Sequence, residues 1–384
     1  MTGSEEKLRE KLLQRQHEAL RDPAEVITAG FEQCGITSKS LQHRVTGDFI
    51  SLLEKLKLTL LVTREYEHLV LALTVRAGKL HQSFLNLPHP AGIAVNRKNN
   101  KVYVAATRNP NAIVELVTSN KIASGRKTPG LLMPSRLKYY SGSTYFHDLA
   151  FINGELHANS VGQNGIIKIN MDSSETEGVS WMPACVKGKK DRNHIQLNSI
   201  AAGKTIKHSY FSASTDTISK YKPGDLKFAV DKKGVLFDGK TGRTIARGLT
   251  RPHSARLYKG KIWVDNSGYG EFGFIRTGSF IPLVKLPGWT RGLCFAGNVA
   301  FVGVSRIIKK FKAYAPGITN ANPICSVYAV DIRTGEIIGS IQWKFGNQIF
   351  GIDSLSASVC SGFPFEKVIA HDEHIKNIFF RYIV

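Results

Sequence analysis

A short motif recurs six times along the chain. Each copy has a polar or small residue, then a small residue or Asp, then a short apolar strand, and soon afterwards a turn into a second apolar or aromatic strand. Units of this kind bury both faces only when copies stack radially round a channel. The repeat therefore predicts an all-β fold, a β-propeller with six blades. The copies are spaced 38 to 59 residues apart and begin at Ala91, His147, Asn198, His253, Arg291 and Phe350.

The number of blades rests on weakly similar copies, so five or seven blades and, as a minority alternative, a large β-sandwich stay open. From Leu58 onward, short runs rich in Val, Ile, Tyr and Phe alternate with turns such as Lys259-Gly260. Two of these runs, at residues 58–63 and 69–75, precede the first motif. We expect them to complete the last blade, which would close the ring and bring both chain ends into one blade.

The first 45 residues have the pattern of a short helical extension. Apolar residues at helical spacing predict one helix that ends near Leu20, and a cap at Asp22 predicts a second one. The apolar stripe is suited to docking on the body or on a protein partner. A third helix is predicted at residues 48–56. We therefore divide the chain into an α-helical N-terminal extension, residues 1–45, and a β-propeller, residues 46–384.

The composition is that of a globular protein, with 42% hydrophobic and 21% charged residues. The longest apolar stretches are too short to cross a bilayer, and the N-terminus opens with Glu and Lys where a signal peptide would be apolar. The five cysteines are widely spread and include no CxxC pair, which predicts neither a disulfide framework nor a zinc knuckle. We expect a soluble protein in a reducing cytoplasm.

The formal net charge of +22 indicates either a polyanionic partner or a basic surface that serves solubility. The excess is diffuse and locally dense only at residues 187–192 and 306–312. No RGG, zinc-finger or RNP-like signature accompanies these two clusters. Nucleic acid is therefore the weaker prediction for a partner.

The aligned first residues of the motif are expected to converge at one rim of the channel. His147, Asn198, His253 and Arg291 would bring two imidazoles, an amide and a guanidinium together from four blades. The planar fork of Arg291 suits a carboxylate or phosphate because it binds two oxygens at once. His147 and His253 could serve as general acid and base, which makes these two and Arg291 the candidate catalytic residues.

His147 and His253 are also the candidate ligands of a divalent metal, with an oxygen donor from Asn198 or Asp148. His194 lies four residues before Asn198 and could reach the same rim. Asn198, His194 and Asp148 are therefore the candidate ligand-binding residues.

These residues also have structural explanations. A histidine at the start of a strand is often buried and bound to a backbone carbonyl, and His147 and Asp148 point to opposite faces of their strand. Arg256 and Arg306 are more simply explained as ion pairs between blades. Asp265 most simply belongs to a turn and is a weaker site candidate.

Other motifs resemble a known family, bacterial β-propeller proteins described as conserved hypothetical proteins with a domain of unknown function. The resemblance runs from about Leu53 to about Leu355, and it implies the propeller without implying a substrate. The chain departs from the family at Asn193, where a cysteine is usual, and at Gln348, where an acidic residue is typical. The matching segments are residues 88–94, 147–150, 191–198, 252–256, 286–293 and 301–306.

The sequence does not assign a reaction. It contains no GxSxG elbow, Walker A loop, HExxH motif or dinucleotide fingerprint in a strand–helix context. Our leading hypothesis is a ligand-binding propeller, with enzymatic activity left open, whose polar rim takes an anionic or metal-bound small molecule. The alternative is a non-catalytic scaffold that binds a protein or a polyanion, because propellers serve both roles.

Overall fold

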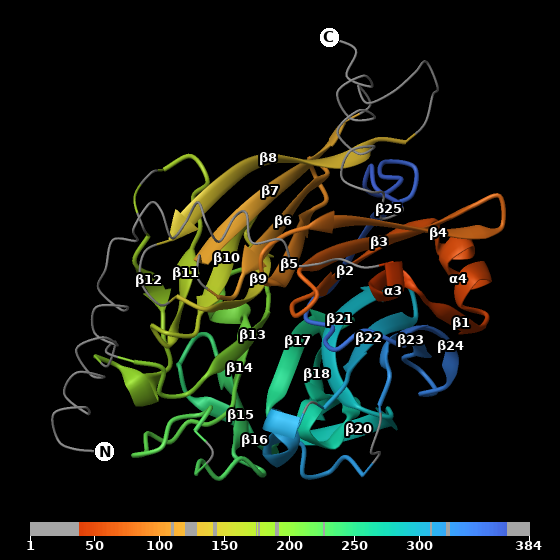
Figure 1. The fold of residues 1–384 in the computed structure, drawn as a ribbon. Coiled ribbons are helices and arrows are strands. Elements are labelled where there is room, and N and C mark those ends of the chain that lie inside the picture. Colours follow the sequence, from red (N-terminus) through yellow and green to blue (C-terminus); the bar gives the residue numbers. More distant parts are fainter. Residues whose placement is uncertain are drawn as a thin grey trace, which may run out of the picture.

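The computed structural model is a six-bladed β-propeller, with its sheets arranged radially round a central channel (Figure 1). The predicted all-β fold and the predicted number of blades are both confirmed. The two helices expected before residue 36 lie outside the described residues. The structure describes residues 38–366 apart from 109–110, 120–128, 141–143, 174, 176, 189–191, 226, 308 and 320–322.

Five of the blades are antiparallel meanders in which the first strand of each lies innermost and the following strands pair outward in chain order. Short 3-10 helices interrupt the connections at Ala184–Val186, Ile206–His208, Ser267–Tyr269 (η3) and Lys309–Tyr314 (η4). From the channel outward, the strands of these blades are β5 (Pro90–Asn96), β6 (Lys101–Ala106), β7 (Asn111–Ser119) and β8 (Leu131–Tyr140); β9 (Phe146–Ile152), β10 (Glu155–Ser160), β11 (Gly165–Lys168) and β12 (Val179–Trp181); β13 (Leu197–Ala201), β14 (Tyr210–Ala213), β15 (Gly234–Asp238) and β16 (Thr244–Leu249); β17 (Pro252–Tyr258), β18 (Lys261–Asn266), β19 (Glu271–Arg276) and β20 (Ser279–Lys285); and β21 (Trp289–Ala296), β22 (Val299–Ser305), β23 (Cys325–Asp331) and β24 (Ile337–Trp343).

The sixth blade joins strands from the two ends of the propeller. Its innermost strand, β25 (Ile352–Ser356), comes last in the chain and pairs with β2 (Leu58–Arg64), which is followed outward by β3 (Leu69–Arg76) and β4 (Lys79–Asn86). The expectation that the early strands complete the last blade is therefore confirmed. Because β25 and β2 pair in this way, the ring of blades is closed by strands from both of its ends.

A separate hydrophobic cluster lies between each pair of neighbouring blades. Strand β2 shows how one strand supplies two of them: Leu60 and Val62 join one cluster, whereas Leu61 joins the next. Successive side chains of a strand point to opposite faces, so a run such as LTLLVTR is buried on both sides. Each blade therefore depends on both of its neighbours for its core.

The residues before β2 pack on the outside of this ring. Strand β1 (Arg44–Gly47) adds a fifth strand to the edge of β24. Helix α4 (Phe49–Leu56), predicted at residues 48–56, buries Phe49 and Leu53, and the Phe49 ring meets Phe301 edge-on at 6.1 Å. A single helical turn, α3 (Ser38–Leu41), precedes β1.

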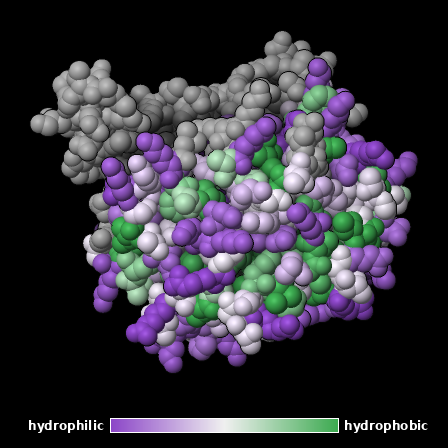
Figure 2. Space-filling view, turned by 90° about the horizontal axis from the view of Figure 1, so that it is seen from below, coloured by the Kyte–Doolittle hydropathy of each residue, from purple (hydrophilic) through white to green (hydrophobic). Residues whose placement is uncertain are grey.

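Hydrophilic and hydrophobic residues are mixed over the side of the molecule that lies at the bottom of Figure 1, seen in Figure 2. Ile245 on β16 and Leu257 on β17 are among the large apolar side chains left partly exposed. Within the described ranges, no helix is long and apolar enough to span a membrane. Cys185, Cys294, Cys325 and Cys360 are free thiols.

Candidate functional site

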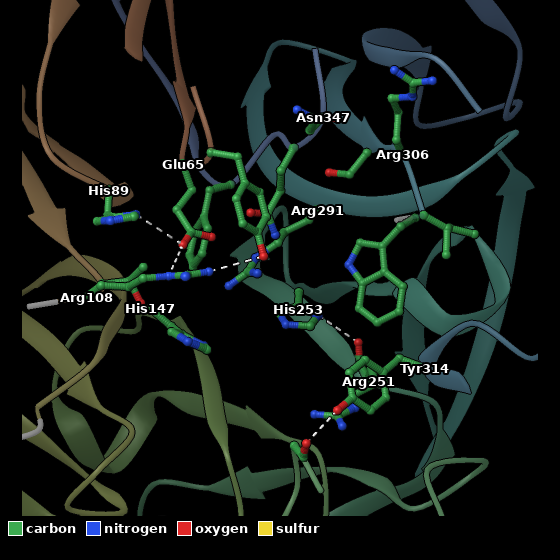
Figure 3. Close-up of a pocket in the computed structure, with 18 of the residues that line it drawn as sticks. Glu65, His89, Arg108, His147, Arg251, His253, Arg291, Arg306, Tyr314 and Asn347 are labelled. Atoms are coloured by element: carbon green, nitrogen blue, oxygen red, sulfur yellow. Dashed lines mark hydrogen bonds and ion pairs between the residues drawn. The ribbon is translucent and has the colours of Figure 1, made fainter. Parts of the chain in front are cut away.

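The aligned first residues of the motif do sit at or just before the starts of the innermost strands, and four of the six line one pocket. His147, His253, Arg291 and Phe350 surround a cavity of about 660 Å³ at one end of the channel (Figure 3). Ala91 and Asn198, at the two remaining equivalent positions, do not line it. The structure therefore brings all three candidate catalytic side chains into one space.

A second ring of side chains, which the sequence reasoning missed, lies two residues earlier in every copy of the motif. All six of these residues line the pocket. The repeated motif carries the signal for this ring, because residues i and i+2 of a strand share a face. The six are His89, Tyr145, Gln196, Arg251, Trp289 and Gln348.

Four members of this second ring have a left-handed backbone, a conformation that non-glycine residues rarely adopt. The φ angles are 43° at His89, 47° at Tyr145, 48° at Gln196 and 52° at Arg251. Each residue immediately precedes its inner strand, so the same turn is repeated in four successive blades. Strained backbone of this kind gathers at sites where a side chain must be aimed.

Connections beyond the second strand of several blades complete the walls. Glu65 follows β2, Arg108 lies just beyond β6 and Arg306 follows β22. Tyr314, the last residue of η4, also lines the pocket, and its hydroxyl donates a 2.7 Å hydrogen bond to the carbonyl of Gly224. Residues far apart in sequence thus meet over the end of the channel.

Glu65 is the centre of an ion-pair cluster on one wall. Its Oε1 accepts a 2.7 Å hydrogen bond from Nε of Arg108 and lies 3.7 Å from Nδ1 of His89. Arg108 also donates to the Tyr66 hydroxyl at 3.1 Å. Burial alone would raise the pKa of Glu65, but His89, Arg108 and Arg291 together lower it. Glu65 is therefore an ionised carboxylate, and Arg108 already has a counter-charge.

Arg251 is an almost fully buried cation with little charge compensation. Its guanidinium lies 4.2 Å from the ring of Tyr314, and its Nη1 donates to Oε1 of Gln196. Nε and Nη2 are buried and have no hydrogen-bond partner in the described part of the chain. Burial lowers the pKa of Arg251 to about 10, which still leaves the group charged near neutral pH.

Arg291 lies between the two histidines and Glu65, and only 7% of it is exposed (Figure 3). Its guanidinium stacks on Phe350 with 3.2 Å between Cζ and the ring centroid. Nη2 is buried and has no hydrogen-bond partner among residues 38–366 where these are described. Burial lowers the pKa of Arg291 to about 10, although Glu65 and Asp148 act in the opposite direction.

His253 is held in one tautomer by its surroundings. Its Nδ1 lies 2.8 Å from the carbonyl of Arg251 and 3.0 Å from the Ser267 hydroxyl. Because that hydroxyl donates its own proton to the carbonyl of Thr290, both partners of Nδ1 act as acceptors. Nδ1 therefore carries the proton, and Nε2 keeps a lone pair. Burial and the charge of Arg291 hold the pKa of His253 well below its usual value, so the ring is neutral.

His147 is also neutral. Burial, followed by the charge of Arg291, holds its pKa well below the usual range. Asn198 acts in the opposite direction, since its amide approaches the imidazole. Nevertheless, Nδ1 of His147 and Oδ1 of Asn198 both lack a hydrogen-bond partner of normal geometry in the part of the chain described.

The three candidate ligand-binding residues lie outside the pocket lining. Asn198 donates from Nδ2 to the carbonyl of Pro252 at 2.9 Å, and the backbone N–H of His194 donates to Oδ1 of Asn164 at 2.7 Å. Asp148 pairs with Arg256, which confirms the ion pair between blades expected for that arginine. These contacts give all three residues structural partners below or beside the site.

Two further expectations differ from the structure in detail. Arg306 lines the pocket and makes no ion pair with any described residue, although an ion pair between blades was expected. Asp265 lies on β18 rather than in a turn, opposite His253 in the strand register. Burial raises the pKa of Asp265 well above its usual value, which favours the protonated form of this carboxyl group.

The charges around the pocket suit an anion better than a metal cation. Of the described residues that line it, four are arginines and one, Glu65, is a carboxylate. No group of three or more His, Cys, Asp or Glu side chains in the described ranges could hold a metal ion. His147 and His253 share the pocket, and the metal site expected from the sequence stays a prediction.

A family model, described as a domain of unknown function (DUF4915), matches residues 47–362. The chain belongs to this family. The match spans all six blades of the DUF4915 propeller, from the last residue of β1 to just beyond β25. It confirms the resemblance of the motifs to a propeller family with a domain of unknown function. No curated protein matches the chain.

The DUF4915 chain is similar to many solved structures at low sequence identity. A chain in the crystal structure of a nidogen/laminin complex has a TM-score of 0.53 at 12% identity, with 79% of this chain and 100% of that chain covered. A luciferin-regenerating enzyme has a TM-score of 0.43 at 11% identity, with 73% and 78% covered. At such identities the likeness extends to the fold alone.

Proposed function

We propose that the channel pocket binds a small anionic ligand. The supporting observation is that Arg251 and Arg291 are buried at its wall with guanidinium N–H groups that have no partner in the described structure. Of the carboxyl groups that act on Arg291, Glu65 pairs with Arg108 and Asp148 with Arg256, while burial raises the pKa of Asp265 and so favours its uncharged form. A buried cation without a counter-ion is costly, and a bound carboxylate or phosphate would supply one.

Titration calorimetry with a panel of carboxylates and phosphate esters tests this proposal. We expect saturable binding by the full-length protein and a loss of at least about tenfold, or 1.4 kcal/mol, in Arg291→Gln and Arg251→Gln. Arg333→Gln is the matched control, because it removes the same charge from an exposed site, where Arg333 pairs with Asp331. Equal weakening in all three variants would show that only the overall charge of +22 attracts anions.

The roles of general acid and base assigned to His147 and His253 stay predictions. Their lowered pKa values make both rings weak bases, better suited to hydrogen bonding than to proton abstraction near neutral pH. The function argued here is therefore binding, with catalysis as an extension to be examined once a ligand is found.

The scaffold alternative makes a different prediction. A protein or polyanion held by the basic surface should be weakened by charge reversal at exposed Lys187, whereas substitutions in the pocket should leave it unchanged. Lys189 and Lys190 lie outside the described residues, as do the N-terminal helices expected to meet a protein partner. A cytoplasmic location is likewise part of the proposal, and the free buried thiols Cys294, Cys325 and Cys360 are compatible with it.

A further inference from the structure

We propose that the ligand of this pocket is an anion that also carries hydroxyl groups, the chemistry shared by sugar acids and sugar phosphates. This inference rests on the proposed function and adds the recognition of hydroxyl groups to that of the anionic group. Arg251 and Arg291 provide donors for an anionic group, while other pocket atoms can only accept a hydrogen bond. A simple carboxylate has no proton to give to those acceptors.

The first acceptor is Nε2 of His253. The proton is fixed on Nδ1 by two acceptors, the carbonyl of Arg251 and the hydroxyl of Ser267, whose own proton goes to Thr290. No hydrogen bond engages Nε2 within the described part of the chain, and the side chain faces the pocket (Figure 3). A neutral imidazole in this tautomer accepts a hydrogen bond at Nε2 and can receive it from a hydroxyl group of the ligand.

The second acceptor comes from Gln348, a member of the ring that lies two residues before each aligned position. Its Oε1 is buried at the pocket and has no hydrogen-bond partner among the described residues. Gln348 and His253 belong to different blades, so the acceptors approach the cavity from separate directions. A ligand with several hydroxyl groups could satisfy both while its charged group meets the arginines.

Hydroxyl groups fit these acceptors better than ammonium groups do. Arg108, Arg251 and Arg291 all act on the neighbouring histidines as positive charges, so the pocket would repel a second cation on the ligand. An amino acid would place its ammonium group in that field. Trp289 lies beside His253, with 5.8 Å between ring centroids, and gives the cavity an apolar face for a carbon skeleton.

The experiment compares matched pairs of ligands that differ only in hydroxyl groups. Calorimetry on the full-length protein would use glucuronate against cyclohexanecarboxylate, gluconate against hexanoate, and glucose 6-phosphate against cyclohexyl phosphate, with glucose as the uncharged reference. We expect the hydroxylated member of at least one pair to bind about 30-fold more tightly than its partner, because a ligand without donors leaves buried acceptors unsatisfied. Glucose should bind more weakly than any of the three charged hydroxylated ligands.

A variant identifies the acceptor responsible. His253→Phe removes Nε2 and keeps an aromatic ring, and we expect it to lose most of the preference for the hydroxylated ligand. His208→Phe is the control, since His208 is exposed on a 3-10 helix and does not line the pocket. If His253→Phe does not fold, Gln348→Met removes the second acceptor and should reduce the same preference.

The outcomes separate this inference from the proposed function. Equal binding of both members in every pair would overturn the hydroxyl inference while anion binding stands. Saturable binding of none of the anions would overturn both. Tighter binding of glucose 6-phosphate than of glucuronate and gluconate would identify a phosphate as the anionic group, and the reverse order would identify a carboxylate.

Discussion

Asp148 on β9 and Arg256 on β17 form a two-pronged ion pair that reaches across the blade between them. Nη1 of Arg256 lies 2.6 Å from Oδ2 of Asp148, and Nη2 lies 2.9 Å from Oδ1. The intervening strand β13 joins this network through Ile200. Its backbone N–H donates a hydrogen bond to Asp148 at 2.9 Å, and its carbonyl accepts one from Arg256 at 3.2 Å. One carboxylate therefore ties three innermost strands together beneath the pocket.

Asp148→Asn should destabilise the fold by about 3 kcal/mol, because it leaves the Arg256 guanidinium partly buried without its counter-charge. Urea unfolding followed by circular dichroism would measure the loss. Glu155→Gln is the control on the same blade, since the Glu155–Lys168 pair is exposed and its removal should change little. Equal midpoints for Asp148→Asn and the wild type would show that the ion pair does not hold the blades together.

Closure of the ring predicts that the last strand is as important for stability as the early ones. Ile352→Ala in β25 should cost about 3 kcal/mol, because Ile352 is 1% exposed within the cluster that the closing blade shares with the blade of strands β21–β24. Ile337→Ala, on the 44% exposed Ile337 of β24, should cost well under about 1 kcal/mol. Comparable losses in the two variants would mean that β25 is not part of the core.

Gly303 provides a way to disturb Arg291 without removing its charge. A Cβ on Gly303 would collide with the carbonyl of Arg291 and approach Ile349 too closely, so Gly303→Ala must shift the backbone under the pocket. We expect a loss of about 1–3 kcal/mol in stability and weaker anion binding. Gly178→Ala, where the space is open, should leave both unchanged. Normal binding by Gly303→Ala would show that the placement of Arg291 is not important for the ligand.

The two buried histidines predict a dependence of stability on pH. The pKa values of His147 and His253 are lowered in the folded protein, so the unfolded chain takes up protons that the folded chain refuses once the pH falls below about 6.5. The free energy of unfolding should therefore be highest above that pH. As the pH falls it should decrease by at most about 1.4 kcal/mol per unit for each histidine.

Urea unfolding at pH 7.5, 6.5 and 5.5 would measure this slope. His68, whose pKa is lowered to about 4 chiefly by burial, contributes in the same direction but is more exposed and should add less. His253→Gln removes one titrating group, and its stability should fall less steeply with acid than that of the wild type. Parallel slopes would show that the folded protein accepts a proton at His253.

The sequence by itself determined the architecture. The six motifs predicted six blades, because sheets that are apolar on both faces must stack against neighbouring sheets. The runs at residues 58–63 and 69–75 predicted that strands from the two chain ends share the last blade. The same alignment placed His147, His253 and Arg291 at one rim. Repetition made this possible, since equivalent positions in a repeat occupy equivalent places round an axis.

Only the tertiary structure decided which groups face the cavity and in what state. Glu65, Arg108 and Tyr314 come from connections of unequal length and sequence, for which the repeat gives no alignment. Asn198, at an aligned position, donates a hydrogen bond to the carbonyl of Pro252 and does not line the pocket. The tautomer of His253 depends on a chain of hydrogen bonds through residues distant in sequence. Burial, charge neighbours and proton positions arise from packing in three dimensions, and a linear pattern does not contain them.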